Sequence, residues 1–141
     1  MGTRKLSDIK SIDLEEIDVD GGNILKFIKN SDTNFKSFGE AYFSFIENKF
    51  IKAWKLHTKM TMNLVVPEGS VKFVFAIKKE GPFKVVEIGT NNYKSIFVPP
   101  NIWFGFQGLS SGKNIILNFA NIVHDENEVQ RLNEDKINYK W

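Results

Sequence analysis

The stretch "WKLHTKMTMN", residues 54–63, holds the side chains best suited to chemistry. His57, one of only two histidines in the chain, lies there between Lys55 and Lys59. An imidazole titrates near neutral pH and can remove a proton from the carbon next to a ketone. A nearby ammonium or amide group can stabilise the oxyanion that this step creates. The stretch therefore predicts a proton-transfer site, with a solvated polar face of a strand as the simpler alternative.

The spacing within this stretch brings the candidate groups together. Side chains alternate between the two faces of a strand, so His57, Lys59 and Asn63 would share one face of an unbroken strand. Lys55 would lie alongside them on the same face. On this pattern, Lys59 or Asn63 would stabilise the developing oxyanion.

A metal site is the alternative that these residues disfavour. Lys59 stands where a His-x-His metal pair would have its second histidine, and an ammonium group repels a cation. The other histidine, His124, precedes a predicted short helical segment in "HDENEVQRLN" (124–133), in which Asp125 and Glu128 resemble a capping box. We expect His124 on the surface, and we expect neither a metal nor another cofactor.

Short strands are the elements that must position these residues. Runs rich in Val, Ile, Phe and Tyr recur along the chain and are separated by turn residues. This pattern predicts an all-β fold, an antiparallel sandwich or barrel. We expect a single domain over residues 1–141, in which 1–22 form an arm lying against the domain or a partner subunit. The expected strands are 23–29, 39–46, 50–57, 62–66, 71–77, 83–89, 93–98, 103–109 and 113–123.

The composition excludes several classes of protein. The chain has 141 residues, a formal net charge of +2 and no cysteine, so disulfides and thiolate chemistry are excluded. Clustered arginines and exposed aromatic platforms are not evident, which argues against nucleic-acid binding. The sequence shows neither the apolar core of a signal peptide nor an apolar run of about 20 residues. We therefore expect a cytoplasmic protein with no membrane partner.

From about residue 39 onward, the sequence resembles the cupin-type dTDP-4-dehydrorhamnose 3,5-epimerases and their shorter sugar-nucleotide relatives. Four features carry the resemblance in a consistent order. They are the strand ending in Leu56-His57, the hairpin "MNLVVPEGSVKFVFAI", the turn and aromatic strand "VPPNIWFGFQGLS", and the C-terminal "HDENEVQRLNEDKINYKW". None of these motifs is specific alone, but their order is fairly specific.

The resemblance implies a double-stranded β-helix, the cupin jelly roll, followed here by a short C-terminal helical segment. It also implies a homodimer that exchanges N-terminal strands. The implied ligand is a nucleotide-diphospho-4-keto-6-deoxy sugar. In such enzymes a histidine, oriented by a carboxylate, removes the proton alpha to the ketone. Cationic or hydrogen-bonding groups stabilise the enolate, and a tyrosine returns a proton from the opposite face.

Carried over residue by residue, the resemblance assigns the base to His57. Glu134 or Asp135 falls near the carboxylate that orients it. The family's arginine is absent before His57, and Lys52 or Lys55 would supply its charge. The family's lysine on the next strand is also absent, which leaves Lys59 as a possible substitute.

Other positions of the family pattern are changed. Phe104 stands where the family has its second histidine, and the tyrosine acid falls near Leu117. Trp103 is a candidate to stack on a nucleobase or sugar, with a core position as the alternative. Two function classes follow. One is a sugar-nucleotide epimerase or isomerase with an altered set of residues, and the other is a cupin that binds a sugar nucleotide, or assists assembly, without catalysis.

Overall fold

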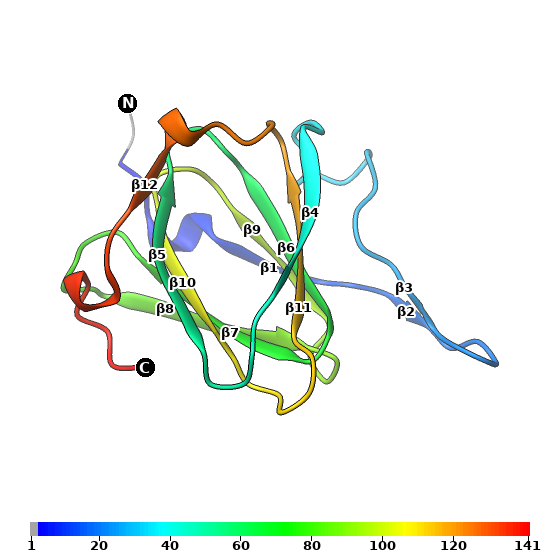
Figure 1. Ribbon diagram of the computed structural model, residues 1–141. Helices are drawn as coiled ribbons and strands as arrows, with labels where there is room; N and C mark the ends of the chain where they lie inside the picture. The colour runs from blue at the N-terminus through cyan, green and yellow to red at the C-terminus, as the bar shows by residue number, and fades with distance from the viewer. Residues whose placement is uncertain (1–2) are drawn as a thin grey trace.

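Two five-stranded antiparallel sheets packed face to face make up most of the structure, a computed structural model that describes residues 3–141 (Figure 1). One sheet has the strand order β1-β9-β6-β11-β4 and the other has the order β12-β5-β10-β7-β8. The strands of the first sheet are β1 (Lys10–Asp13), β9 (Lys94–Val98), β6 (Met62–Glu68), β11 (Ile115–Ala120) and β4 (Glu40–Phe45). Those of the second are β12 (Val129–Arg131), β5 (Ile51–His57), β10 (Trp103–Gly108), β7 (Ser70–Ala76) and β8 (Phe83–Gly89).

This arrangement confirms the predicted all-β jelly roll. Successive strands mostly alternate between the two sheets. Strands β6 and β7, joined by the tight turn at Gly69, lie in different sheets and so do not form the expected hairpin, whereas β7 and β8 pair with each other. The helical content within residues 3–141 is limited to short 3-10 turns, so the predicted C-terminal helical segment is two such turns. The three turns are η1 (Leu6–Asp8), η2 (Glu126–Glu128) and η3 (Glu134–Lys136).

We call the space between the inner faces of the two sheets the lumen. Alternation along the strands sends every second side chain into it. Phe73 and Phe75 of β7 point inward, and Leu64 and Val66 of β6 face them from the other sheet. These side chains are almost fully buried and form the main hydrophobic core. The lumen is therefore filled over much of its length. A ligand can enter only where the lining side chains are polar or small enough to leave room.

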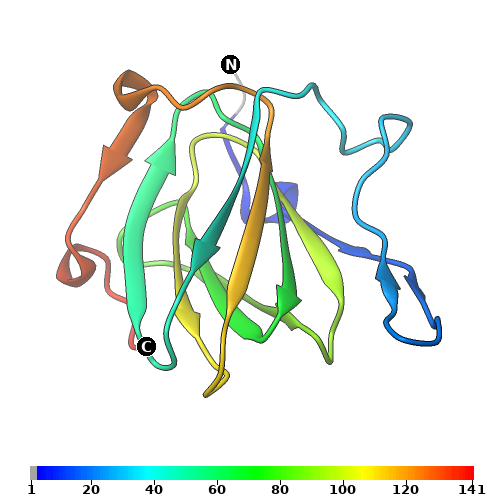
Figure 2. The ribbon, with the colours of Figure 1, turned by 45° about the vertical axis from the view of Figure 1, so that its right-hand side comes forward.

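A second, smaller core lies on the outer face of the β5-β10-β7 sheet. Trp54 packs there with Val74, Ala76 and Ile137. The C-terminal segment covers this face and ends beside it, on the side of the barrel opposite the N-terminal hairpin (Figure 2). The end of the chain therefore supports the strand that carries His57.

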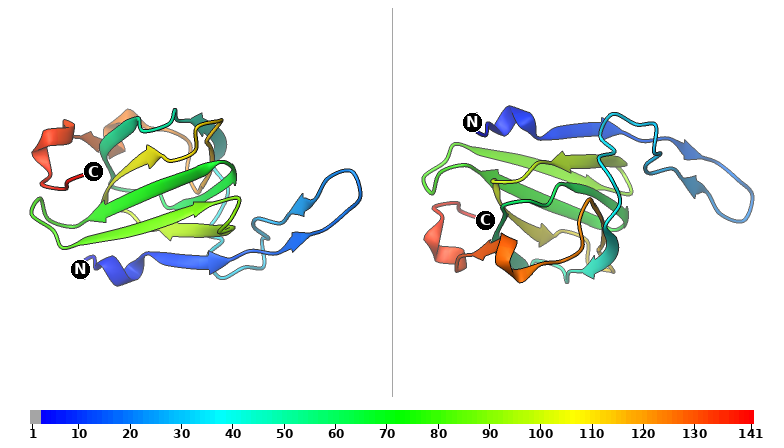
Figure 3. Two further views of the ribbon diagram at one scale, coloured as in Figure 1. Left: turned by 90° about the horizontal axis from the view of Figure 1, so that it is seen from below. Right: turned by 90° about the horizontal axis from the view of Figure 1, so that it is seen from above.

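The N-terminal arm pairs with its own chain. Strand β1 pairs antiparallel with β9 and completes the edge of the first sheet. Beyond it, β2 (Glu16–Ile17) and β3 (Ile24–Leu25) form a small hairpin that projects from the body (Figure 3). Within the predicted strand 23–29, ladder pairing covers Ile24–Leu25 and Lys26 adds one backbone hydrogen bond to Glu15. The chain then leaves the hairpin, and Phe27 packs edge-on against Phe119 of β11.

Candidate active site

His57 is the last residue of β5, and its imidazole lies in the lumen with 4% of the side chain exposed. Its ring stacks on that of Phe104 in the neighbouring strand β10, with centroids 5.9 Å apart and 18° between the planes. Nδ1 of His57 lies 2.5 Å from Oε2 of Glu128. The histidine predicted from sequence is thus buried and paired with a carboxylate, which rules out the alternative of a solvated polar face.

Glu128 reaches His57 because the chain folds back beside β5. The Asp125 side chain accepts a hydrogen bond from the backbone N–H of Asn127, at 2.9 Å, and caps the η2 turn. Strand β12 follows directly and pairs with β5, with Val129 opposite His57. Glu128, just before this pair, turns its side chain inward and is 1% exposed. The predicted helical turn is present, but the Glu128 carboxylate contacts the histidine instead of closing a capping box.

Backbone groups complete the environment of this carboxylate. Oε1 of Glu128 accepts hydrogen bonds from the N–H groups of Lys59, at 3.0 Å, and Met60, at 2.8 Å. Burial acts to raise the pKa of Glu128, but the bonds from His57, Met60 and Lys59 together outweigh it and lower the pKa below its ordinary value. Glu128 is therefore ionised at neutral pH and can only accept hydrogen bonds.

The charge on Glu128 decides which nitrogen of His57 carries the proton. A carboxylate acceptor at Nδ1 requires that Nδ1 be the donor, which leaves Nε2 as the basic nitrogen of a neutral ring. Burial lowers the pKa of His57 below 6.5, against the opposing effect of the Glu128 hydrogen bond. Nε2 is buried and has no hydrogen-bond partner among the residues that the structure describes. The site therefore presents an unprotonated basic nitrogen inside the lumen.

Acidification should destabilise the fold through this imidazole. Because burial lowers the folded-state pKa of His57 below 6.5, the unfolded chain takes up a proton first as the pH falls. The contribution of the neutral His57 to the free energy of unfolding is fully present above pH 6.5, and it is lost as the pH falls from there through the folded-state pKa. One such proton changes the free energy of unfolding by at most about 1.4 kcal/mol per pH unit.

Urea unfolding at pH 7 and pH 5 measures this loss. The wild type should lose more stability between the two pH values than the His57→Asn variant, which lacks the titrating group. An equal loss in both proteins would show that His57 does not resist protonation in the folded state.

A cavity of about 510 Å³ lies next to the His57–Phe104 stack, and His57 itself does not line it. Phe104, on which the imidazole stacks, is part of its wall, and Lys55 lies opposite Phe104 in the β5–β10 pairing. Burial, followed by the nearby charge of Arg131, lowers the pKa of Lys55 below its usual 10.5. The residues that line this cavity are Ser44, Lys52, Ala53, Trp54, Lys55, Phe104, Phe106, Arg131, Leu132 and Asn133.

An irregularity in β5 brings two lysines to this cavity. Phe104 pairs with Lys55, but the next residue, Gly105, pairs with Ala53, so Trp54 is an extra residue without a partner in β10. Lys52 pairs with Phe106, which packs against the main core. Positions 52 and 55 would face opposite ways in a regular strand, and the extra residue puts both on the lumen side. Lys52 and Lys55, the two candidates to supply the charge of the family's absent arginine, therefore both line the cavity.

The carboxylate that contacts His57 is Glu128, so the assignment to Glu134 or Asp135 is wrong. Both of those side chains are exposed, whereas His57 is buried. Glu134 contributes its backbone carbonyl, which accepts a hydrogen bond from Nε1 of Trp54 at 3.0 Å on the outer face of the sheet. The sequence held one usable signal for Glu128, an acidic residue in a capping pattern, but that pattern pointed to a local role.

Lys59 and Asn63 do not share a face with His57, because β5 ends there and the chain bends at residues 58–59 before β6 begins. The Lys59 side chain is exposed, and only its backbone N–H takes part in the site. The Asn63 amide is buried on the outer side of β6, where it exchanges hydrogen bonds with Asn34. Neither side chain is placed to stabilise an oxyanion near His57.

Trp103 also lies outside the lumen. It pairs with Leu56 and Ala76 and packs with the smaller core on the outer face. The prediction that its ring stacks on a ligand is wrong, and the core alternative holds. His124 is exposed, as expected, and its Nε2 lies 3.1 Å from a carboxylate oxygen of Glu126.

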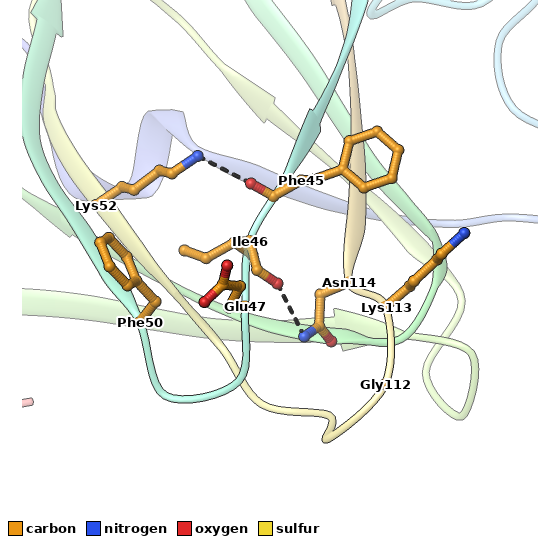
Figure 4. Close-up of a pocket in the computed structure, with 8 residues that line it drawn as sticks. All are labelled: Phe45, Ile46, Glu47, Phe50, Lys52, Gly112, Lys113 and Asn114. Atoms are coloured by element: carbon orange, nitrogen blue, oxygen red, sulfur yellow. Dashed lines mark hydrogen bonds between the residues drawn. The ribbon is translucent and has the colours of Figure 1, made fainter.

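A smaller cavity of about 290 Å³ lies at the turn between β4 and β5, with Phe45 and Phe50 on two of its sides (Figure 4). Nζ of Lys52 donates a hydrogen bond to the carbonyl oxygen of Phe45 at 2.9 Å, and Nδ2 of Asn114 donates to that of Ile46 at 3.1 Å (Figure 4). Lys52 lines both cavities, so they adjoin at this side chain.

The searched part of the chain, residues 3–141, contains no group of three or more His, Cys, Asp or Glu side chains arranged to hold a metal ion. Over the same residues, no helix is long and apolar enough to cross a membrane.

Solved structures of sugar-nucleotide enzymes closely resemble this fold. A dTDP-sugar isomerase from Desulfovibrio desulfuricans is 28% identical with a TM-score of 0.88, over 94% of this chain and 90% of that one. A sugar 3,4-ketoisomerase from Thermoanaerobacterium thermosaccharolyticum, in complex with TDP, is 19% identical with a TM-score of 0.78, over 94% of each chain. A dTDP-4-dehydrorhamnose 3,5-epimerase from Sulfolobus tokodaii is 17% identical with a TM-score of 0.80, over 96% of this chain and 84% of that one.

These likenesses confirm the cupin jelly roll and the resemblance to dTDP-sugar epimerases and isomerases. A scan against protein-family models finds no match, and a search of curated proteins finds none either.

Proposed function

We propose that this protein is an epimerase or isomerase of a nucleotide-diphospho-4-keto-6-deoxy sugar, with His57 as the general base. The observation that carries the proposal is the buried pair of His57 and Glu128, whose free nitrogen Nε2 lies in the lumen. A buried nitrogen without a hydrogen-bond partner destabilises the fold, so its presence here is explained if it has a role in binding or catalysis. The enzymes of similar structure act on dTDP-linked sugars, which supports this class of substrate.

The geometry supports a simple first step. Nε2 of His57 removes the proton from the carbon next to the ketone, and the electron pair of the broken C–H bond moves toward the ketone oxygen to form an enolate. The ring then carries a positive charge, which the ionised Glu128 stabilises across the Nδ1 hydrogen bond. Lys55 and Lys52 line the adjoining cavity and offer N–H donors to the enolate and the diphosphate.

Solvent exchange tests this proposal directly. Wild-type protein is incubated in deuterated water with dTDP- and UDP-linked 4-keto-6-deoxy sugars, and deuterium at the carbons next to the ketone is followed by NMR. We expect time-dependent deuterium incorporation at one of those carbons. The matched control is the same nucleotide sugar with a hydroxyl in place of the ketone, which has no acidified proton and should not exchange.

The alternative class, a cupin that binds a sugar nucleotide without catalysis, has a distinct outcome in the same samples. A ligand that binds only the folded state raises the melting temperature by mass action. A thermal shift with the keto sugar but no exchange would establish binding alone. If the keto sugar causes no thermal shift and shows no exchange, the proposed function is contradicted altogether.

We also propose that the protein is a homodimer assembled through its N-terminal region. The β2–β3 hairpin projects from the body and exposes Val19 and Ile24, with 46% and 51% of their surface accessible. Sedimentation velocity at micromolar concentration should show a dimer, and the Val19→Glu/Ile24→Glu variant should dissociate. Val85→Glu, an exposed valine of β8, is the control that should remain dimeric. A wild-type monomer would contradict this assignment.

A further inference from the structure

We infer that Tyr42 and Asn118, on the wall of the lumen opposite His57, bind the reacting edge of the sugar and relay a proton between its two oxygens. This inference rests on the proposed function and assigns the substrate a ketone beside a free hydroxyl group. Asn118 lies in β11 and Tyr42 opposite it in β4, so both belong to the sheet that faces β5. Ile116 and Ala120, two residues either side of Asn118, are in the main core, which places Asn118 on the lumen side.

Contacts place this pair at the same end of the lumen as His57. Nδ2 of Asn118 lies 3.8 Å from Sδ of Met60. The backbone N–H of Met60 donates to Glu128, the carboxylate that holds His57. One residue therefore touches both walls.

Both walls also hold a buried polar atom that the rest of the protein leaves unused. Asn118 is 3% exposed, and its Oδ1 has no hydrogen-bond partner within residues 3–141. Nε2 of His57 is in the same condition across the lumen. Buried side-chain polar atoms in folded proteins are satisfied with few exceptions, so two at one end of one lumen indicate a place shaped for a polar ligand.

The hydrogen-bonding character of the pair indicates what that ligand presents. Nδ2 of Asn118 donates to Oη of Tyr42 at 2.9 Å, which leaves the phenolic hydrogen free to donate elsewhere. Oδ1 of Asn118 can only accept. One free donor beside one free acceptor complements a ketone oxygen next to a hydroxyl group.

Among the three tyrosines, the two others are placed elsewhere. The hydroxyl of Tyr93 donates to the backbone oxygen of Lys26. Tyr139 packs against Phe83 and Trp141 at the smaller core on the outer face. Tyr42 is therefore the phenol that can face a ligand in the lumen, although it does not occupy the position of the family's tyrosine near Leu117.

The relay balances without any further reactant. Nε2 of His57 takes the proton from the carbon that bears the hydroxyl, and the C–H electron pair becomes the C=C bond of an enediolate. The ketone oxygen, now negative, takes the phenolic proton of Tyr42, and the Asn118 N–H stabilises the resulting phenolate. The proton of the neighbouring hydroxyl passes to that phenolate. His57 then returns its proton to the former ketone carbon, so the ketone has moved to the adjacent carbon.

Tyr42→Phe removes the relaying oxygen and little else, which makes it the main test. The probes are dTDP, which lacks the sugar, and a dTDP-linked 4-keto-6-deoxy sugar. We expect kcat for the keto sugar to fall at least about tenfold, within the range of general acid–base effects, while the Kd for dTDP stays within twofold of wild type. Tyr93→Phe, which removes a phenol outside the lumen, is the matched control and should change neither value.

Asn118→Leu, of similar size, is the second variant. It should raise the Kd for the dTDP-linked keto sugar until it approaches the Kd for dTDP alone, and the Kd for dTDP should not change. If the wild type turns over the keto sugar and the kcat of Tyr42→Phe stays within twofold of the wild-type value, the inference is overturned and the proposed function stands. A wild type that neither exchanges nor converts the keto sugar would overturn the proposed function, and the inference with it. A variant that loses dTDP binding together with turnover would show a structural role and contradict the assignment.

Discussion

Replacing His57 by asparagine should lower the rate of solvent exchange at the substrate's alpha carbon by about 10²–10⁴-fold, the usual contribution of a general base. The amide can still donate a hydrogen bond to Glu128, so the carboxylate keeps a partner in the buried site. Asparagine has no group that accepts a proton at neutral pH. The fold and the affinity for the nucleotide sugar should therefore survive while exchange is lost.

His124→Asn is the matched control for this substitution. That histidine is exposed and bonded to Glu126 on the surface, so its loss should leave exchange unchanged. Deuterium incorporation and the thermal shift with ligand would be measured on both variants and on wild type. Exchange at the wild-type rate in the His57→Asn variant would mean that another group takes the proton and that the buried pair is structural.

Glu128→Gln should cost a similar factor for a different reason, the position of one proton. The glutamine oxygen can still accept from the N–H groups of Lys59 and Met60. Its NH₂ group then faces Nδ1 of His57, which must become an acceptor, so the ring proton moves to Nε2. The nitrogen that faces the substrate loses its lone pair. We expect a loss of about 10²–10⁴-fold in kcat, as in other sites where an amide reverses the histidine tautomer.

The tautomer itself can be measured, which separates this explanation from general damage. ¹⁵N NMR of the imidazole should show the proton on Nδ1 in wild type and on Nε2 in the Glu128→Gln variant. Asp135→Asn, an exposed carboxylate on the adjacent C-terminal segment, should alter neither the tautomer nor the rate. Wild-type kcat in the Glu128→Gln variant would refute the assignment of Glu128 as the residue that orients the base.

The sequence predicted most of the central strands and the place of His57 at the end of one of them, because local periodicity and the Leu56-His57 motif depend on near neighbours. It was insufficient for Glu128, which is 71 positions further along the chain and reaches His57 only through the pairing of β12 with β5. It also failed for Lys59 and Asn63. The period-2 argument assumed an unbroken strand, whereas the backbone bends after His57 to cross to the other sheet.

For the two lysines of the cavity, strand alternation alone would have been misleading in the opposite direction. Period-2 alternation would have separated Lys52 from Lys55, and the extra residue at Trp54 brings them to one face. An irregularity of this kind depends on how β10 and the outer core contact the strand, and the residues of β5 alone do not predict it. Similarly, Trp103 was a reasonable stacking candidate by type, and only the register with Leu56 and Ala76 shows that it points outward.

The separation of His57 and Glu128 along the chain sets the order in which the protein gains its chemistry. Contacts between distant positions form late in folding, because a long loop must close before they contribute. During synthesis, His57 leaves the ribosome long before Glu128 exists, and β5 then lacks both its edge partner β12 and the carboxylate. The imidazole meets its partner only after the sheets have assembled. A chain arrested before residue 128 can build much of the barrel and still lack an oriented base.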